Sequence, residues 1–204
     1  MAFIDGQNLF YAAKEAFGYR HPNYDPLALA SRVCQDRGWD LREVRFYTGI
    51  PDAADNAFWN SFWVRKAGAM GHQGIIVWTR PLRYRPTTVK LPDGTAFTFR
   101  SGSEKGTDVR IALDLIRQAH RNTYDVGVVF SQDQDLSEAT DEIRIIAQEQ
   151  SRFIRMASAF PSSPARPRYK LRGIERTDWI RIDQTTYDAC IDPTDYRLPP
   201  ATTP

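Results

Sequence analysis

Short apolar runs alternate along the chain with segments whose apolar residues recur every three or four positions. The short runs predict buried strands, and the periodic segments predict helices. The predicted strands cover residues 3–4, 44–47, 75–78, 126–130, 153–156 and 179–182. The predicted helices cover residues 7–17 and 56–70, with further helical faces in 109–116 and 139–147. This alternation predicts an α/β domain with a central, mostly parallel sheet flanked by helices.

Two features depart from the alternation. Residues 87–91 and 95–100, joined by Pro92-Asp93-Gly94, read as an inserted hairpin. Residues 161–204 read as a C-terminal extension packed on a main domain of residues 1–160. Within that extension, the prolines and serines of 161–168 predict a surface loop, and the proline-rich residues 192–204 predict a strap over the surface or a loose tail.

Composition is that of a globular protein. The chain has 204 residues, of which 42% are hydrophobic, enough for one domain with a sizeable core. No apolar run approaches the ~20 residues that cross a bilayer, and no basic stretch opens the chain, so we expect neither membrane spanning nor secretion. Cys34 and Cys190 match no zinc or redox spacing, which favours a reducing, cytoplasmic location. The sequence leaves homo-oligomer formation open.

Charge is unevenly distributed along the chain. Residues 80–110 hold seven basic and three acidic side chains, and residues 152–181 hold eight basic and two acidic ones. Between them, residues 125–142 hold six acids and no base. Each run alone is typical of a solvated face, but an acidic centre between basic segments suits a metal-dependent enzyme acting on a polyanion.

Polar residues follow the predicted strands at three places. Asp5 and Asn8 lie in F-I-D-G-Q-N, Asp108 lies in K-G-T-D-V-R-I-A-L-D, and Asp133 and Asp135 lie in V-V-F-S-Q-D-Q-D-L. In open α/β sheets, ligands bind beyond the carboxyl ends of the strands, so we expect these side chains to converge there. The converging carboxylates would repel one another unless cations neutralised them, and oxygen ligands suit Mg²⁺ or Mn²⁺.

Helix capping is the alternative for each acid taken singly. Asp5 and Asp108 precede or open predicted helices, and Asp135 with Glu138 matches a capping box with Asp in place of Ser. Asp114 lies about 120° around the helix from Asp108, which favours a supporting or structural role.

The three acidic segments, in this order and spacing, resemble the NYN domain of the LabA-like group within the PIN-like nuclease superfamily. The resemblance covers about residues 1–160, and the tail after Trp179 is also similar to that of bacterial members. It implies a PIN-like fold and a metal-dependent ribonuclease. Carried over by position, it implies an acidic metal-binding and catalytic cluster with Asn8 beside it, made of Asp5, Asp108, Asp133 and Asp135.

One segment departs from the family pattern. The family's third motif usually reads S-G-D-S-D-F, where this chain has Gln132 for the glycine and Leu136 for the aromatic residue. Gln132 would demand a different backbone angle or narrow the approach to substrate. Both carboxylates are kept, so metal binding is less affected than substrate geometry.

These observations favour hydrolysis of phosphodiester bonds in RNA, preferably single-stranded, with Mg²⁺ or Mn²⁺ as cofactor. The candidate substrate-binding residues are Lys105, Ser131, Arg83, Tyr84 and Arg85. The alternative is a catalytically weak RNA-binding or regulatory module of the same fold, and a third interpretation is an aspartate-based phosphotransfer receiver. The chain has no P-loop, dinucleotide-binding glycine pattern or nucleophile-elbow serine, which excludes those classes.

Overall fold

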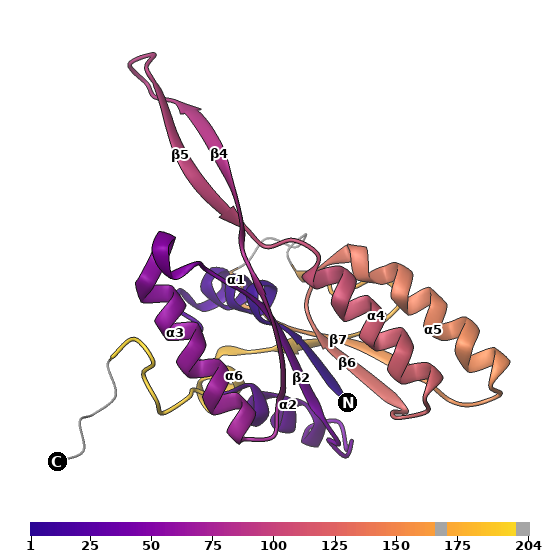
Figure 1. Ribbon diagram of the computed structural model, residues 1–204. Coiled ribbons are helices and arrows are strands. Elements are labelled where there is room, and N and C mark those ends of the chain that lie inside the picture. The colour runs from indigo at the N-terminus through magenta and orange to yellow at the C-terminus, as the bar shows by residue number, and fades with distance from the viewer. Residues whose placement is uncertain (166–170, 199–204) are drawn as a thin grey trace.

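Six parallel strands form the central sheet of the computed structural model, which describes residues 1–165 and 171–198 (Figure 1). Their order across the sheet is β3-β2-β1-β6-β7-β8. The strands are β1 (Ala2–Asp5), β2 (Val44–Ile50), β3 (Ile76–Pro81), β6 (Val126–Phe130), β7 (Arg155–Pro161) and β8 (Asp178–Ile182). The parallel sheet confirms the α/β prediction.

Helices cover both faces of this sheet and create two cores. On one face lie α1 (Gly6–Phe17), α2 (Pro26–Gln35), α3 (Ala53–His72) and the short α6 (Gln184–Asp188). On the other lie α4 (Thr107–His120), the 3-10 turn η1 (Gln134–Leu136) and α5 (Ser137–Glu149). Because successive strand residues point to opposite faces, Phe3 enters the α4–α5 core while Ile4 enters the α1–α3 core.

The strand order reverses between β1 and β6. From β1 the chain continues into α1 on one face, and from β6 it continues through η1 into α5 on the other. The two segments that follow β1 and β6 therefore diverge at the carboxyl ends of these neighbouring strands. The last paired residues before they separate are Ile4 and Phe130. Such a switch point leaves a crevice in which open α/β sheets bind ligands.

A two-stranded hairpin projects from the body of the domain (Figure 1). Its strands β4 (Arg83–Lys90) and β5 (Ala96–Ser103) pair with each other and with no other strand in the part of the chain that the structure describes. At the tip, Gly94 adopts a φ of 85°, and the Asp93 carboxylate accepts the Thr95 amide at 2.9 Å, as a tight turn requires. The predicted hairpin is confirmed, and its strands reach further toward the body than the apolar pattern indicated.

Two helices were not predicted, and one strand begins later than predicted. The start of α2 has a readable signal, because Asp25 caps it by accepting the amides of Leu27 and Ala28 at 2.8 and 3.0 Å and Pro26 occupies its first turn. The five-residue α6 is too short for a periodic pattern. Strand β7 starts at Arg155, and Phe153, which the prediction included, is 66% exposed.

The C-terminal segment adds to the domain in two ways. Strand β8 pairs in parallel with β7 and so widens the same sheet. The described end of the tail lies along α3, where the Arg65 guanidinium donates to the carbonyls of Tyr196 and Leu198. Part of the predicted 161–168 loop, residues 166–168, falls outside the described residues, as does 199–204 of the tail.

Among the helices that the structure describes, none is long and apolar enough to cross a membrane.

Candidate active site at the carboxyl edge of the sheet

An acidic pocket of about 390 Å³ opens at the switch point between β1 and β6. Its walls come from one side of α1, the segment between β5 and α4, the first turn of α4 and the loop after β6. Five acidic residues line it, and four of them, Asp5, Glu104, Asp108 and Asp133, come from the loops and helix starts around the switch point, while the fifth, Glu15, lies further along α1. The structure thus brings together three of the predicted acids and two acids that were not predicted.

Asp5 ends β1 and caps α1 at the same time. Its Oδ1 accepts the Asn8 amide at 2.9 Å, the usual contact of a helix N-cap. Its Oδ2 lies 3.5 Å from the Ser131 hydroxyl, which donates to it. The capping interpretation and the site interpretation are therefore compatible for Asp5, because one carboxylate fulfils both.

Burial makes Asp5 an unusual carboxyl group. It is only 6% exposed, and this burial raises its pKa to about 7. The negative charges of Glu104 and Asp133 raise the pKa further, while the hydrogen bond from the Asn8 amide opposes them. A pKa near 7 means that both the protonated and the charged form are accessible near neutral pH, and a nearby cation would favour the charged form.

Hydrogen bonds join the loop after β6 to the start of α1. The Asn8 side-chain oxygen accepts the Gln132 amide at 3.0 Å, and the Ser131 hydroxyl accepts the Asp133 amide at 3.1 Å. Ser131 is 1% exposed, so the structure places it between Asp5 and Asp133 rather than at the surface. Asn8 and Ser131 thus fix the separation of the two strand ends that carry the acids.

Glu104 is the more buried of the two pocket acids that were not predicted from the sequence. It follows the hairpin directly, and its Oε2 accepts the Gly49 amide of β2 at 2.6 Å, which turns the carboxylate into the pocket. Burial, and to a lesser degree the charge of Asp108, raises its pKa. The available signal was its place immediately before Lys105, at the head of the second acidic segment.

Gly49→Ala should displace Glu104 with little effect on the fold. A Cβ at this position would lie 2.4 Å from the Leu82 side chain and 2.7 Å from Glu104 Oε2, and both are the ends of flexible side chains that can move away. We expect any metal-dependent cleavage to fall about 10-fold, as when a group that orients a ligand is lost. Chemical denaturation should show a change below about 1 kcal/mol, and wild-type cleavage in a folded variant would contradict this role.

Asp108 and Asp135 do not cap helices as the sequence suggested they could. Gly106, with a φ of 77°, is the N-cap of α4, which leaves the Asp108 carboxylate in the first turn facing the pocket. Asp135 lies in η1, is exposed and does not line the pocket. Its backbone amide donates to Asp133 Oδ1 at 3.1 Å. Asp135 therefore lies beside the site and contacts Asp133 through its backbone, not through its carboxylate.

Asp114 belongs to a separate buried network on α4. Its carboxylate accepts the Tyr47 hydroxyl at 2.9 Å and pairs with Arg110 at 3.0 Å. Arg45 on β2 lies 3.6 Å away. These contacts place Asp114 as a link between α4 and the sheet, in agreement with the supporting role predicted for it.

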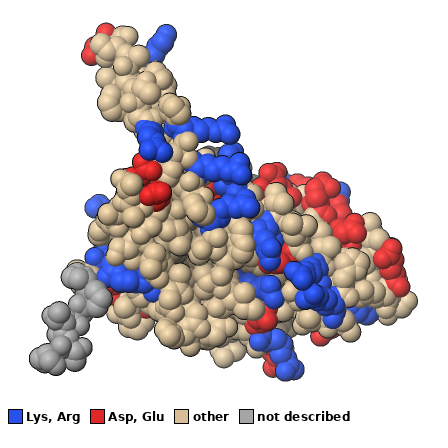
Figure 2. All heavy atoms as spheres, viewed as in Figure 1, with Lys and Arg blue, Asp and Glu red and all other residues tan. Residues whose placement is uncertain are grey.

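The candidate substrate-binding side chains lie around the hairpin base. Lys105 lines the pocket, and its carbonyl accepts from the Arg80 guanidinium at 2.9 Å. Arg83 and Arg85 are exposed on β4, whereas the Tyr84 ring packs 5.2 Å under the Arg100 guanidinium. Lys and Arg side chains gather at the hairpin base and on the adjoining surface beside α4 (Figure 2). A cationic surface therefore adjoins the acidic pocket.

The Gln132 departure has a structural explanation. Gln132 does not have a positive φ, so its backbone does not need the conformational freedom of glycine. Its side chain donates to the Arg172 carbonyl at 2.7 Å, and the Gln134 side chain bonds the Gly173 carbonyl and the Glu175 amide at 3.0 and 3.1 Å. The two glutamines therefore connect the acidic loop to the C-terminal segment.

The donor chemistry of the pocket fits a divalent cation. Asp5, Glu104, Asp108 and Asp133 supply hard oxygen ligands, and none of these four forms an ion pair within the described residues. In the positions they occupy, however, no three acidic, histidine or cysteine side chains of residues 1–165 and 171–198 already form a metal-binding group. Cation binding would therefore require the carboxylates to draw together.

Comparison with known families matches this architecture. The family model described as NYN domain matches residues 1–148, which include every acid of the pocket. Comparison with curated proteins finds no match.

Proposed function

The chain belongs to the NYN domain family of PIN-like, nuclease-type domains, and we propose that it is a metal-dependent ribonuclease of the LabA-like group. The observation that carries the proposal is the acidic pocket at the strand switch point, where Asp5, whose pKa burial raises to about 7, lies among Glu104, Asp108 and Asp133. Acids gathered around a buried carboxyl group do not stabilise a fold, because each added negative charge raises the free-energy cost of ionising that carboxyl. Their presence together therefore favours a function over a structural role.

Asp5, Glu104, Asp108 and Asp133 would hold Mg²⁺ or Mn²⁺, with Asp135 as a candidate at the edge of the group. When bound, a divalent cation supplies Lewis-acid stabilisation of the negative charge that develops on a phosphodiester under attack by water. Asp5 would lose its proton as the site fills. Asn8 and Ser131 would keep the two acid-bearing loops in register, and Lys105 would orient a phosphate at the rim.

The proposed substrate is single-stranded RNA. The pocket contains acids, which alone would repel a polyanion, so the strand must be held by cations outside it. Arg83 and Arg85 at the hairpin base and Lys105 at the pocket rim would supply these cations. A flexible single strand can follow this surface into the pocket.

Cleavage of a labelled single-stranded RNA tests the proposal. With Mn²⁺ or Mg²⁺ we expect shorter products, and with EDTA we expect none, because the acids need a cation to act on phosphate. Asp133→Asn should lower the rate by about 10²-fold or more. Product length and end chemistry are read on a denaturing gel.

Asp135→Asn is the matched control on the same loop. Because its carboxylate lies outside the pocket, we expect a smaller loss of cleavage than Asp133→Asn causes. A wild-type protein that binds RNA in a salt-dependent way but never cleaves it with either metal would overturn the nuclease and establish the RNA-binding module instead.

A further inference from the structure

The projecting hairpin has two chemically different faces, defined by its strand register. Directly opposite residues of an antiparallel pair share a face. Val89 is opposite Phe97, Thr87 is opposite Phe99, and Arg85 and Arg83 are opposite Ser101 and Ser103. We call the surface made by Arg83, Arg85, Val89, Phe97 and Phe99 the Phe97 face.

The opposite face is fixed to the body of the domain. The Tyr84 hydroxyl accepts the Asp52 amide at 3.1 Å, and Arg100 pairs with Asp55 at 3.1 Å, both partners lying at the start of α3. The Phe97 face therefore turns away from α3. In Figure 1, α4 and the chain that leads into it lie on the side of the hairpin base away from α3.

Two aromatic rings lie exposed on the Phe97 face. Phe97 is 55% and Phe99 is 40% exposed, and their rings stack with centroids 6.0 Å apart at an interplanar angle of 21°. Side chains this apolar usually contribute to a core, but a two-stranded ribbon has no core to place them in. Their flat faces instead form a small aromatic platform.

The face changes character toward the pocket. Phe97 and Phe99 lie in its outer half, and Arg83 and Arg85 lie near the body. The outer half of the hairpin is largely uncharged up to its tip, while Lys and Arg side chains gather at its base (Figure 2). Strand β5 then ends at Ser103, and the next residue, Glu104, already lines the acidic pocket.

We propose that the Phe97 face is a binding track for single-stranded RNA that leads into the acidic pocket. Bases would stack on Phe97 and Phe99, and Arg83 and Arg85 would hold the phosphates of the strand that continues into the pocket. Aromatic platforms combined with arginines are how proteins hold single strands without reading their sequence. The direction of the track, but not the binding itself, rests on the proposed nuclease function.

Charge favours RNA over a second copy of the chain as the occupant. In a two-fold symmetric pairing, each Phe97 face would meet its own equivalent, which would place the arginines of both copies in one interface to which the face brings no acid. A polyanion neutralises the same arginines, and unpaired bases supply the planar partners that the exposed rings can stack on.

Binding of a fluorescent single-stranded RNA of about 16 nucleotides, in EDTA so that no cleavage occurs, tests the track. The double variant Phe97→Thr, Phe99→Thr keeps strand-forming residues and should weaken affinity at least about 5-fold, the effect of losing one stacked base. The same double variant should bind a fully paired RNA duplex of this length almost as well as the wild type does, because the bases of a duplex are not free to stack on the rings. Thr88→Val with Thr98→Val, on the opposite face, is the matched control and should bind like wild type.

The outcomes separate the track from the nuclease. Unchanged affinity of the Phe97, Phe99 variant for single-stranded RNA would overturn the track, whether or not the wild type cleaves with Mn²⁺. Loss of affinity in a protein that never cleaves would support the track and overturn the nuclease. If the Phe97, Phe99 variant bound RNA like the wild type but had a smaller particle mass than the wild type by light scattering, the track would be overturned and the face would be identified as a contact between copies.

Discussion

Asp5→Asn is expected to slow cleavage by orders of magnitude and at the same time to stabilise the metal-free protein. The variant loses the most buried carboxylate of the pocket, and we expect a fall in the cleavage rate of about 10²- to 10⁴-fold. It keeps a side-chain oxygen for the Asn8 amide, so the cap of α1 should survive. Cleavage rate and urea denaturation measured on the same preparations check both parts.

The stabilisation has a defined pH dependence. Burial raises the pKa of Asp5 to about 7 in the folded protein, above the value of about 3.9 in an unfolded chain. The contribution of its protonated form to stability is therefore complete below about pH 4 and is lost as the pH rises through about 7. At pH 8 the metal-free wild type should be less stable than Asp5→Asn by up to about 4 kcal/mol.

A cation should reverse this difference. Mn²⁺ at pH 8 would neutralise the charged pocket and raise the melting temperature of the wild type, while Asp5→Asn would respond less. Asp135→Asn, which changes an exposed carboxylate of the neighbouring loop, should keep the wild-type decline of stability with pH. A wild type whose stability is flat between pH 4 and 8 would show that Asp5 is not buried as described.

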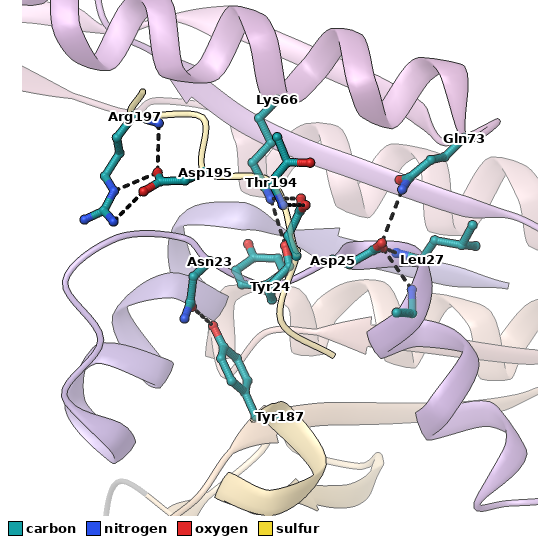
Figure 3. Close-up of polar contacts among 12 residues, drawn as sticks. Asn23, Tyr24, Asp25, Leu27, Lys66, Gln73, Tyr187, Thr194, Asp195 and Arg197 are labelled. Atoms are coloured by element: carbon teal, nitrogen blue, oxygen red, sulfur yellow. Dashed lines mark hydrogen bonds and ion pairs between the residues drawn. The ribbon is translucent and has the colours of Figure 1, made fainter. Parts of the chain in front are cut away.

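Lys66→Met is expected to cost about 3–5 kcal/mol in the free energy of unfolding. Lys66 is fully buried on α3, and its Nζ donates to the Tyr24 carbonyl at 2.8 Å and to Asp192 Oδ2 at 3.0 Å (Figure 3). The rings of Tyr24 and Tyr196 lie 5.7 and 4.9 Å from the ammonium group. Burial lowers the pKa of Lys66, and the Asp192 charge opposes that shift. Removing the amine would leave Asp192, only 9% exposed, without its charged partner.

A second substitution separates loss of the ion pair from loss of packing. Lys66→Met combined with Asp192→Asn removes both charges, and we expect it to regain part of the lost stability because no uncompensated charge stays buried. Urea denaturation with an unchanged m-value gives the comparison. A single variant within about 0.5 kcal/mol of wild type would mean that Lys66 is not buried with Asp192.

The sequence was most informative where a candidate functional residue comes directly after a strand. Asp5 and Asp133 were expected beside each other because both follow buried strands, and the structure places both in one pocket. Glu104 could not be found in this way, since its direction is set by a hydrogen bond to the amide of Gly49, far away in sequence. Asp135 was expected to join the cluster, but the tight turn of η1 places its side chain outside the pocket.

The same distinction holds for the fold. The strands, their parallel pairing and the hairpin could be predicted from apolar runs, turn residues and the alternation of strands with helices. The order of the strands across the sheet was not predicted, because it depends on contacts between distant parts of the chain. The contact of Gln132 with Arg172 joins parts of the chain that are distant in sequence. Gln132 has no positive φ, so the loss of the family's glycine at this position does not strain the backbone. The sequence alone gave no sign that the Gln132 side chain would instead bind the C-terminal segment.

The contacts of Gln132 and Gln134 also bear on the smallest piece of this chain that can function. The matched family region ends at residue 148, before β7 begins. The acidic loop, however, is tied to residues 172–175, and β8 completes the sheet beside β7. A fragment cut at the family boundary would keep every acid of the pocket yet lose the segment that holds their loop in place. Fragments intended for biochemistry should therefore run through β8 and on to Tyr196, whose ring lies against Lys66.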